Sequence, residues 1–256
     1  LPPTNPDVLP SPFWDVLPLQ NYFAYSPIAE SQHTLTLQRR ATYTCSYNGK
    51  WQSTRKAAET LRYLRLKYSY DFIVFNDDFS ATPQWTQAFV DMLEKYDLLG
   101  LFMWSCRASP DKVDSKLLDR LREGGCVIVD YGEIDVTTTN SKLDMERLTG
   151  AVESTRTIGL TPVLRFTIGD AATNKHHVTE ATAFLKSQNL LHKPRIAEPY
   201  PQTKYCTEDP KDLDKHLTQI NSSFINTTQY SDAELLGIIE LMSRGDLDRL
   251  EKIRDV

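Results

Sequence analysis

The feature that most constrains this chain is a regular alternation of short apolar runs with longer segments of helical periodicity. Residues Phe72–Phe75 form a continuous apolar run, as expected of a strand that is buried on both faces. Residues 83–98 follow, with apolar positions at three- and four-residue spacing. Parallel strands joined by helical crossovers are the economical arrangement of such units. The other expected strands are 34–38, 101–104, 126–129, 162–168 and 195–197, and the other expected helices are 53–68, 114–123, 142–158 and 178–189.

This alternation predicts the α/β class and divides the chain into three parts. Residues 1–33 form a lead-in, with six prolines among the first 18 residues, and proline fixes φ and removes a backbone donor. Residues 34–206 carry about six βα units. Residues 207–256 form a C-terminal extension with helices expected at 209–220 and 232–255. Periodicity alone allows either a doubly wound sheet or a partial (βα) barrel.

Composition excludes several classes of protein. The chain has 29 Lys and Arg against 34 Asp and Glu, a net charge of -5, which argues against a general binder of nucleic acid. No apolar run is long enough for a bilayer, so we expect neither a nucleic-acid nor a membrane partner. Four cysteines are too few for a disulfide framework in a chain of 256 residues. Glycosylation sequons at Asn221 and Asn226 leave a secretory route open.

Charged side chains cluster at or near the ends of the expected strands. Functional residues of parallel α/β proteins gather at the carboxyl ends of the strands. There the sequence places Asp77 and Asp78, Arg107, Glu133 and Arg165. We expect a small charged or zwitterionic molecule to bind there, its amine or hydroxyls on the carboxylates and its carboxylate on the arginines. The alternative for each residue is an ordinary capping carboxylate or a rim salt bridge.

Six segments carry a resemblance to a known family. They are Pro12–Leu19 with Tyr22, Phe75–Phe79, Trp104–Arg107, Gly124–Cys126 with Tyr131–Glu133, Ile168–Asp170 and Pro199–Thr203. In this order and spacing they resemble motifs of cobalamin-dependent radical SAM enzymes, over about Pro10 to Cys206. The resemblance implies a partial parallel (βα)6 TIM-like barrel. It also implies a cytoplasmic location and leaves open a cobalamin-binding domain upstream in the natural chain.

The sequence departs from that family at the iron–sulfur motif. Where the family has Cys-x-x-x-Cys-x-x-Cys, this chain has Ala41, Cys45 and Asn48. Three thiolates must converge to hold the cluster and leave one iron open for SAM. We therefore predict that no iron–sulfur cluster binds and that radical chemistry is lost, while SAM binding stays open. If Gly132 aligns with the family's ribose motif, Glu133 comes one residue early, and such a slip turns a strand side chain to the other face.

The leading hypothesis for function is a cluster-less radical-SAM-like barrel, a pseudoenzyme that binds a small molecule at its mouth. One alternative is an enzyme that uses SAM or another cofactor in polar, transferase-like chemistry, with mouth carboxylates as acid or base. A second alternative is a secreted structural or interaction protein on a recycled barrel. The identity of the ligand, the oligomeric state and the compartment are not encoded in any motif of the sequence.

Overall fold

The structure is a computed structural model that describes residues 5–9, 40–47, 49–138, 142–197 and 228–255. The chain divides into two compact units, one of residues 1–131 with 150–163 and one of residues 132–149 with 164–256. Each unit is described by itself below. The expected strand at 34–38, the expected helix at 209–220 and most of the lead-in lie outside the described residues, as do Asn48, Asn221 and Asn226.

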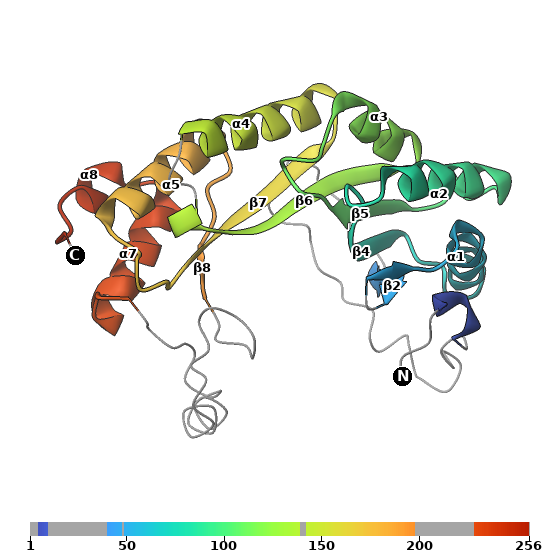
Figure 1. The fold of residues 1–256 in the computed structure, drawn as a ribbon, viewed down its shortest axis with the longest axis horizontal. Helices are drawn as coiled ribbons and strands as arrows, with labels where there is room; N and C mark the ends of the chain where they lie inside the picture. Colours follow the sequence, from blue (N-terminus) through green and yellow to red (C-terminus); the bar gives the residue numbers. More distant parts are fainter. Residues whose placement is uncertain (1–4, 10–39, 48, 139–141, 198–227, 256) are drawn as a thin grey trace, which may run out of the picture. The chain divides into compact units, whose positions relative to one another are not determined.

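Six strands form one sheet in the order β1-β4-β5-β6-β7-β8 (Figure 1). The order follows the chain without the reversal that defines a doubly wound sheet. Together with parallel pairing, this sequential order is that of a partial TIM-like barrel, so the predicted fold class is confirmed. The strands are β1 (Arg40–Tyr43), β4 (Phe72–Asp78), β5 (Met103–Arg107), β6 (Cys126–Asp135), β7 (Thr161–Ile168) and β8 (Arg195–Ile196).

Helices alternate with these strands as the periodicity predicted. Ser53 caps α1, since its side chain accepts a hydrogen bond from the Lys56 N–H. The helix expected at 232–255 is broken instead, because Gly245 adopts a left-handed conformation with φ 65. No described helix has both the length and the apolar character needed to cross a membrane. The helices are α1 (Thr54–Tyr68), α2 (Pro83–Lys95), α3 (Ser115–Glu123), α4 (Lys142–Thr157), α5 (Lys175–Ser187), α7 (Asp232–Arg244) and α8 (Leu247–Leu250).

Three strands run further than their apolar runs predicted. Asp77 and Asp78 lie within β4, Arg107 within β5 and Glu133 within β6, not in the loops that follow. Likewise Ala41 lies within β1, paired with Ile73. The expected strand ends were wrong because the backbone ladder continues wherever neighbouring strands pair, whatever the polarity of the side chains on the open face.

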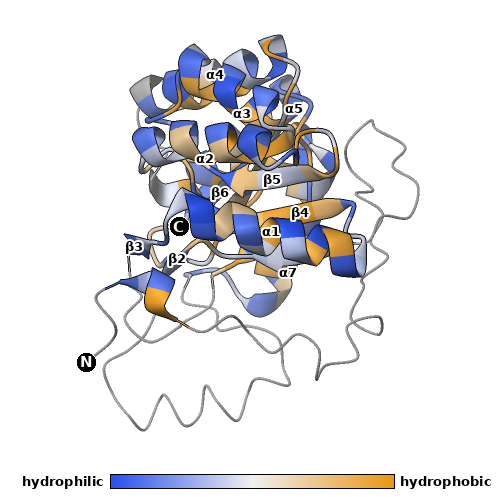
Figure 2. Ribbon diagram, turned by 90° about the vertical axis from the view of Figure 1, so that its right-hand side faces the viewer, coloured by the Kyte–Doolittle hydropathy of each residue, from blue (hydrophilic) through white to orange (hydrophobic). Residues whose placement is uncertain are grey.

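The first unit packs its strands against α2 through aromatic rings. The fully buried Trp104 ring lies 5.4 Å from Phe75 and 5.3 Å from Phe79, measured between centroids. Its indole N–H donates to the Gly124 carbonyl over 2.7 Å. Figure 2 shows β4 as largely hydrophobic, while α1 alternates between hydrophilic and hydrophobic residues as an amphipathic helix does. This packing assigns one face of β4 and β5 to the core.

The second unit has a mainly aliphatic core. In it α5 packs against α7 and α8. Phe166 on β7 and Phe184 on α5 supply a ring contact, with 6.2 Å between centroids. Tyr230 is buried as well. Buried aliphatic side chains and Met242 make up most of the rest of this core, among them Leu164, Ile168, Val178, Leu185, Leu235, Ile238, Ile239, Met242 and Leu250.

Candidate functional site

Asp77 fastens the segment after β1 to β4. The residue is 4% exposed. Its Oδ2 accepts a hydrogen bond from the Cys45 N–H over 2.6 Å. Its Oδ1 accepts from the Ser46 N–H over 2.9 Å and from the Ser46 hydroxyl over 2.6 Å. Both carboxylate oxygens therefore have donors within the protein, and charge-assisted bonds of this kind are the stronger class.

Cys45 is buried in the same segment. It is 1% exposed, and this burial, with the Asp77 carboxylate near it, raises the pKa of the Cys45 thiol well above its ordinary value. The thiol is therefore kept in its protonated form, which is neither a nucleophile nor a good metal ligand. The Cys45 carbonyl accepts a hydrogen bond from the Gln52 N–H over 2.9 Å, which ties Cys45 to the residue after β3.

A short hairpin follows Cys45, and sequence reasoning missed it. Strand β2 (Ser46–Tyr47) pairs antiparallel with β3 (Lys50–Trp51). The signal was present in the sequence, because Asn48-Gly49 is a preferred dipeptide of two-residue hairpin loops. The Trp51 ring packs on Trp85 of α2, with 4.5 Å between centroids. The hairpin is thereby joined to the helix that follows β4.

A row of charged residues crosses three strands of the first unit. Arg107 on β5 is in register with Asp78 on β4 and with Asp130 on β6. Residues in register share a face of the sheet, and neighbours along a strand alternate between faces. Trp104 faces α2, where it contacts Phe89, so Arg107, three residues on, lies on the opposite face. We call Asp78, Arg107 and Asp130 the Asp–Arg–Asp row.

The members of this row differ in what they contact. Asp78 accepts hydrogen bonds from the Ser80 N–H over 2.9 Å and from the Ser109 hydroxyl over 3.1 Å. Arg107 is exposed, and its guanidinium makes no hydrogen bond or ion pair within the described part of the chain. Asp130 is half-buried. Sequence reasoning missed Asp130. The signal was that Asp130 stands two residues after Ile128 of the expected strand 126–129, and residues two apart in a strand share a face.

The second unit carries the other two predicted site residues, Glu133 and Arg165. Glu133 makes an ion pair with Arg195, with 2.6 Å between Oε1 and the guanidinium. Arg195 is in register with Thr167 on β7. Arg165 stands two residues before Thr167 and therefore shares its face, opposite the face on which Phe166 meets α5. Arg165, Thr167 and Arg195 thus lie on the face of β7 and β8 that is opposite α5.

Gly132 determines where Glu133 lies. It has a φ of 78, in the left-handed region that favours glycine. A residue in this conformation breaks the alternation of a strand and re-aims the next side chain. The left-handed conformation of Gly132 is therefore an irregularity within β6, and Glu133, the residue after it, pairs with Arg195.

Two further cysteines of the first unit are free thiols. Cys106 and Cys126 are both buried, and burial raises the pKa of the Cys106 thiol well above its ordinary value. The Cys126 thiol donates to the Ile128 carbonyl over 3.3 Å. Among the residues that the structure describes, no group of three or more His, Cys, Asp or Glu side chains is arranged to hold a metal ion.

The fold and this geometry define the chain as a partial (βα) barrel with polar side chains on the faces of its strands opposite α2 and α5. No family model matches the chain, and no curated protein matches it. Similar solved structures include the radical S-adenosylmethionine methyltransferase TsrM from Kitasatospora setae with cobalamin and a 4Fe-4S cluster bound, at 13% identity and a TM-score of 0.45 over 56% of this chain. A second TsrM structure, with tryptophan substrate and a SAM analog, has 13% identity and a TM-score of 0.47 over 58% of this chain.

A putative racemase from Roseobacter denitrificans is also similar, at 11% identity and a TM-score of 0.35, over 77% of this chain and 57% of that one. This chain spans 30% of the length of TsrM. At these identities and TM-scores the likeness concerns the arrangement of helices and strands, and it carries no argument about activity.

Proposed function

We propose that this chain binds a small zwitterionic molecule on the Asp–Arg–Asp row without radical chemistry. The observation that carries the proposal is Arg107, an exposed guanidinium without a described partner that stands in register between two carboxylates. A guanidinium offers a planar fork of donors that matches a carboxylate. The flanking carboxylates of Asp78 and Asp130 suit a protonated amine. An α-amino acid carries both groups at a separation that neighbouring strands can meet.

The positions of the iron–sulfur motif support the second half of this proposal. Ala41 has no ligand atom and lies within β1. Cys45 is buried with its thiol protonated and its backbone held by Asp77. Asn48 lies outside the described residues. The described residues at these positions do not fit a 4Fe-4S cluster, which needs converging thiolates, and no step of the proposed function passes through one.

Binding in this proposal is non-covalent. The ligand carboxylate exchanges water for the two parallel N–H donors of Arg107, and its amine donates to the carboxylates beside it. Asp77 acts as a positioning residue, because it holds the Cys45–Ser46 segment against β4. The three hydrogen bonds that Asp77 accepts keep this edge of the strands ordered before the ligand binds. Binding then costs less conformational entropy, because fewer groups have to become ordered.

Calorimetric titration with a panel of free amino acids tests the proposal. Amino acid methyl esters and N-acetyl amino acids, which lack one of the two charges, serve as comparison ligands. Binding of one or more amino acids should weaken by about tenfold or more in R107Q and stay unchanged in R62Q, since Arg62 is an exposed arginine on α1 without a described partner. Equal affinity for an amino acid and its ester, or equal loss in both variants, would contradict the assignment.

Anaerobic reconstitution with iron and sulfide tests the absence of a cluster. The purified chain should retain neither after desalting. Retention of about four irons and four sulfides per chain would refute the cluster-less proposal and leave the amino acid titration to be judged separately.

A further inference from the structure

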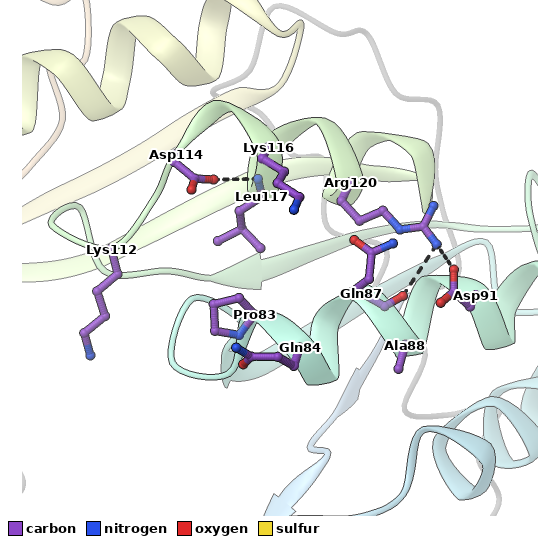
Figure 3. Close-up of a pocket in the computed structure, with 10 residues that line it drawn as sticks. All are labelled: Pro83, Gln84, Gln87, Ala88, Asp91, Lys112, Asp114, Lys116, Leu117 and Arg120. Carbon is purple, nitrogen blue, oxygen red and sulfur yellow. Dashed lines mark hydrogen bonds and ion pairs between the residues drawn. The ribbon is translucent and has the colours of Figure 1, made fainter.

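Three of the described helices have N-termini that are capped by different chemical groups. Helix α3 follows Asp114, whose carboxylate accepts the Leu117 N–H over 2.7 Å (Figure 3). Helix α7 begins with a capping box, in which the Ser231 hydroxyl accepts the Glu234 N–H and the Glu234 carboxylate accepts the Ser231 N–H. Helix α5 begins with the same kind of box, but His177 takes the place of the glutamate. Carboxylates and imidazoles ionise in different pH ranges, so these helix starts differ in their response to acid.

The α5 box depends on an uncharged His177 ring. The Asn174 side chain accepts the His177 N–H over 3.1 Å, and the Nδ1 atom of His177 accepts the Asn174 N–H over 3.3 Å. An imidazole nitrogen accepts a hydrogen bond only while it carries no proton. Protonation of His177 at Nδ1 therefore removes the acceptor and sets a ring proton against the Asn174 N–H.

Both acidic and basic groups lie near His177. Burial, followed by the charge of the neighbouring His176, lowers the pKa of His177 below its ordinary value of 6.5. The Ala172 carbonyl, Asp135 at the end of β6 and Asp170 in the loop before α5 act in the opposite direction and are outweighed. The folded protein therefore favours the neutral ring that the box requires.

The first turn of α5 gathers positive charge in acid. It begins with Lys175, His176 and His177 and contains no acidic residue. The Lys175 ammonium lies 3.6 Å from Oδ2 of Asp255, and Nε2 of His176 lies 4.0 Å from Oε1 of Glu180. A charge on His177 is added at the end of the helix where the backbone dipole is already positive. Protonation thus opposes this helix start through charge as well as through the lost hydrogen bond.

The α5 box also holds the loop between β7 and α5. This loop, residues 169–174, follows the carboxyl end of β7, the end at which parallel α/β proteins carry their binding residues. Within the loop the Asp170 side chain accepts the Ala172 N–H over 2.8 Å. At its start Gly169 packs so closely that a Cβ there would lie 3.1 Å from Ala197. The loop is therefore held beside β8 at one end and by the box at the other.

We propose that His177 is an acid-sensitive latch: when its ring takes up a proton, the capping box opens, the first turn of α5 frays and the loop of residues 169–174 is released from the helix. The stabilisation is complete above the ordinary histidine pKa of 6.5. It declines as the pH falls below that value, because the opened form binds the proton more readily than the closed form does. The latch involves residues of the second unit alone and does not depend on the proposed amino acid site.

The α7 box provides a comparison within the same chain. The Arg254 guanidinium, followed by the N–H and hydroxyl of Ser231, lowers the pKa of Glu234 to about 2. Glu234 therefore stays ionised over the range in which a histidine becomes charged, and the α7 box should stay closed there. Replacing His177 by a glutamine should give α5 the same indifference to pH, since a glutamine oxygen accepts the N-cap N–H and does not titrate.

NMR-detected amide exchange of the whole chain at about pH 7.5 and about pH 5 tests the latch. Protection is expressed relative to the intrinsic exchange rate at each pH. At the Asn174 and His177 amides it should fall by roughly fivefold or more in acid, while it stays unchanged at the Ser231 and Glu234 amides of α7. H177Q should keep its protection at both pH values. H176Q, which removes the exposed neighbouring imidazole, should still lose protection in acid.

Equal protection of Asn174 at the two pH values in the unaltered chain would overturn the proposal, and so would an equal loss in H177Q. A parallel loss at Ser231 and Glu234 would indicate general acid unfolding and would contradict a local latch. Should H177Q fail to fold, an NMR titration of the unaltered chain decides. The Asn174 amide resonance should then shift with the same midpoint as the His177 ring, below 6.5, and two different midpoints would refute the coupling.

Discussion

The two compact units each carry arginine and carboxylate side chains on or beside their strands, yet they use them differently. In the second unit Arg195 is neutralised by Glu133 at 2.6 Å. In the first unit Arg107 lies in register between Asp78 and Asp130 and makes no described ion pair. The same residue types therefore make a structural contact in one unit and a candidate ligand contact in the other. The type of residue therefore does not decide whether an arginine has a structural role or can bind a ligand. What decides it is whether a carboxylate lies close enough to pair with the guanidinium.

The cores beneath these faces also differ. The first unit is built on fully buried aromatic rings around Trp104, whereas the described core of the second is largely aliphatic, with a ring contact between Phe166 and Phe184. Aromatic clusters gain energy from edge-to-face geometry as well as from buried area. We therefore expect removal of one ring to lower the free energy of unfolding more in the first unit than in the second.

The largest expected effect is that of W104A. Removing this ring leaves a cavity and also leaves the Gly124 carbonyl without its donor, so the free energy of unfolding should fall by about 5 kcal/mol. F166A in the second unit should cost about 3 kcal/mol. Urea denaturation of both variants checks the ranking. An F166A loss equal to or greater than that of W104A would contradict the contrast between the cores.

The next effect is that of D77A. The variant leaves the buried Cys45 N–H without an acceptor, which should lower the free energy of unfolding by about 3 kcal/mol. Release of this segment should also make the Cys45 thiol react faster with a disulfide reagent. D111A is the control, because Asp111 is exposed without a described partner, and it should change stability by less than about 0.5 kcal/mol. Unchanged labelling in D77A would show that Asp77 does not hold the segment.

A smaller effect separates the two arginines directly. R195Q removes a partly exposed ion pair and should cost about 0.5 kcal/mol at low salt, with less at high salt. R107Q should leave stability nearly unchanged, since it breaks no described contact, while the proposed amino acid binding should weaken by about tenfold or more. Chemical denaturation of both variants at low and high salt measures these changes in the free energy of unfolding. A greater stability loss in R107Q than in R195Q would assign Arg107 a structural role.

The smallest expected effect concerns Glu234 in the second unit. The Arg254 guanidinium, followed by the N–H and hydroxyl of Ser231, lowers the pKa of Glu234 from an ordinary 4.5 to about 2. A lowered pKa in the folded state stabilises the protein above the ordinary value and loses that contribution as the pH falls toward 2. The melting temperature of E234Q should therefore lie slightly below that of the unaltered chain at pH 7, with the gap closing in acid. A gap that does not change with pH would exclude this linkage.

Much of the fold was predictable because its signals are local. The helix at 53–68 and the buried apolar run of β4 are both read from neighbours in the chain. The helix expected at 114–123 begins one residue later, because Asp114 is its N-cap. The ends of β4, β5 and β6 were not predictable in this way. Polar residues continue those strands because the partner strands continue, and the partner lies tens of residues away in sequence.

In the candidate site, too, the local sequence indicated some features and strand pairing set the others. Asp78 and Arg107 were predicted as candidates because residues near the carboxyl ends of parallel strands are the usual place for a site. Their contacts were not evident, and neither was Asp130. Nor could spacing show that Asp77, next to Asp78, is buried beneath the Cys45–Ser46 segment while Arg107 stays exposed.

The sequence by itself determined the order of strands and helices, because each element is set by the pattern of neighbouring residues. Only the tertiary structure decided that Arg107 lies between Asp78 and Asp130 and that Glu133 lies against Arg195. Strand register and the left-handed conformation of Gly132 set those contacts. Both result from pairing between segments far apart in the chain, which no local pattern specifies.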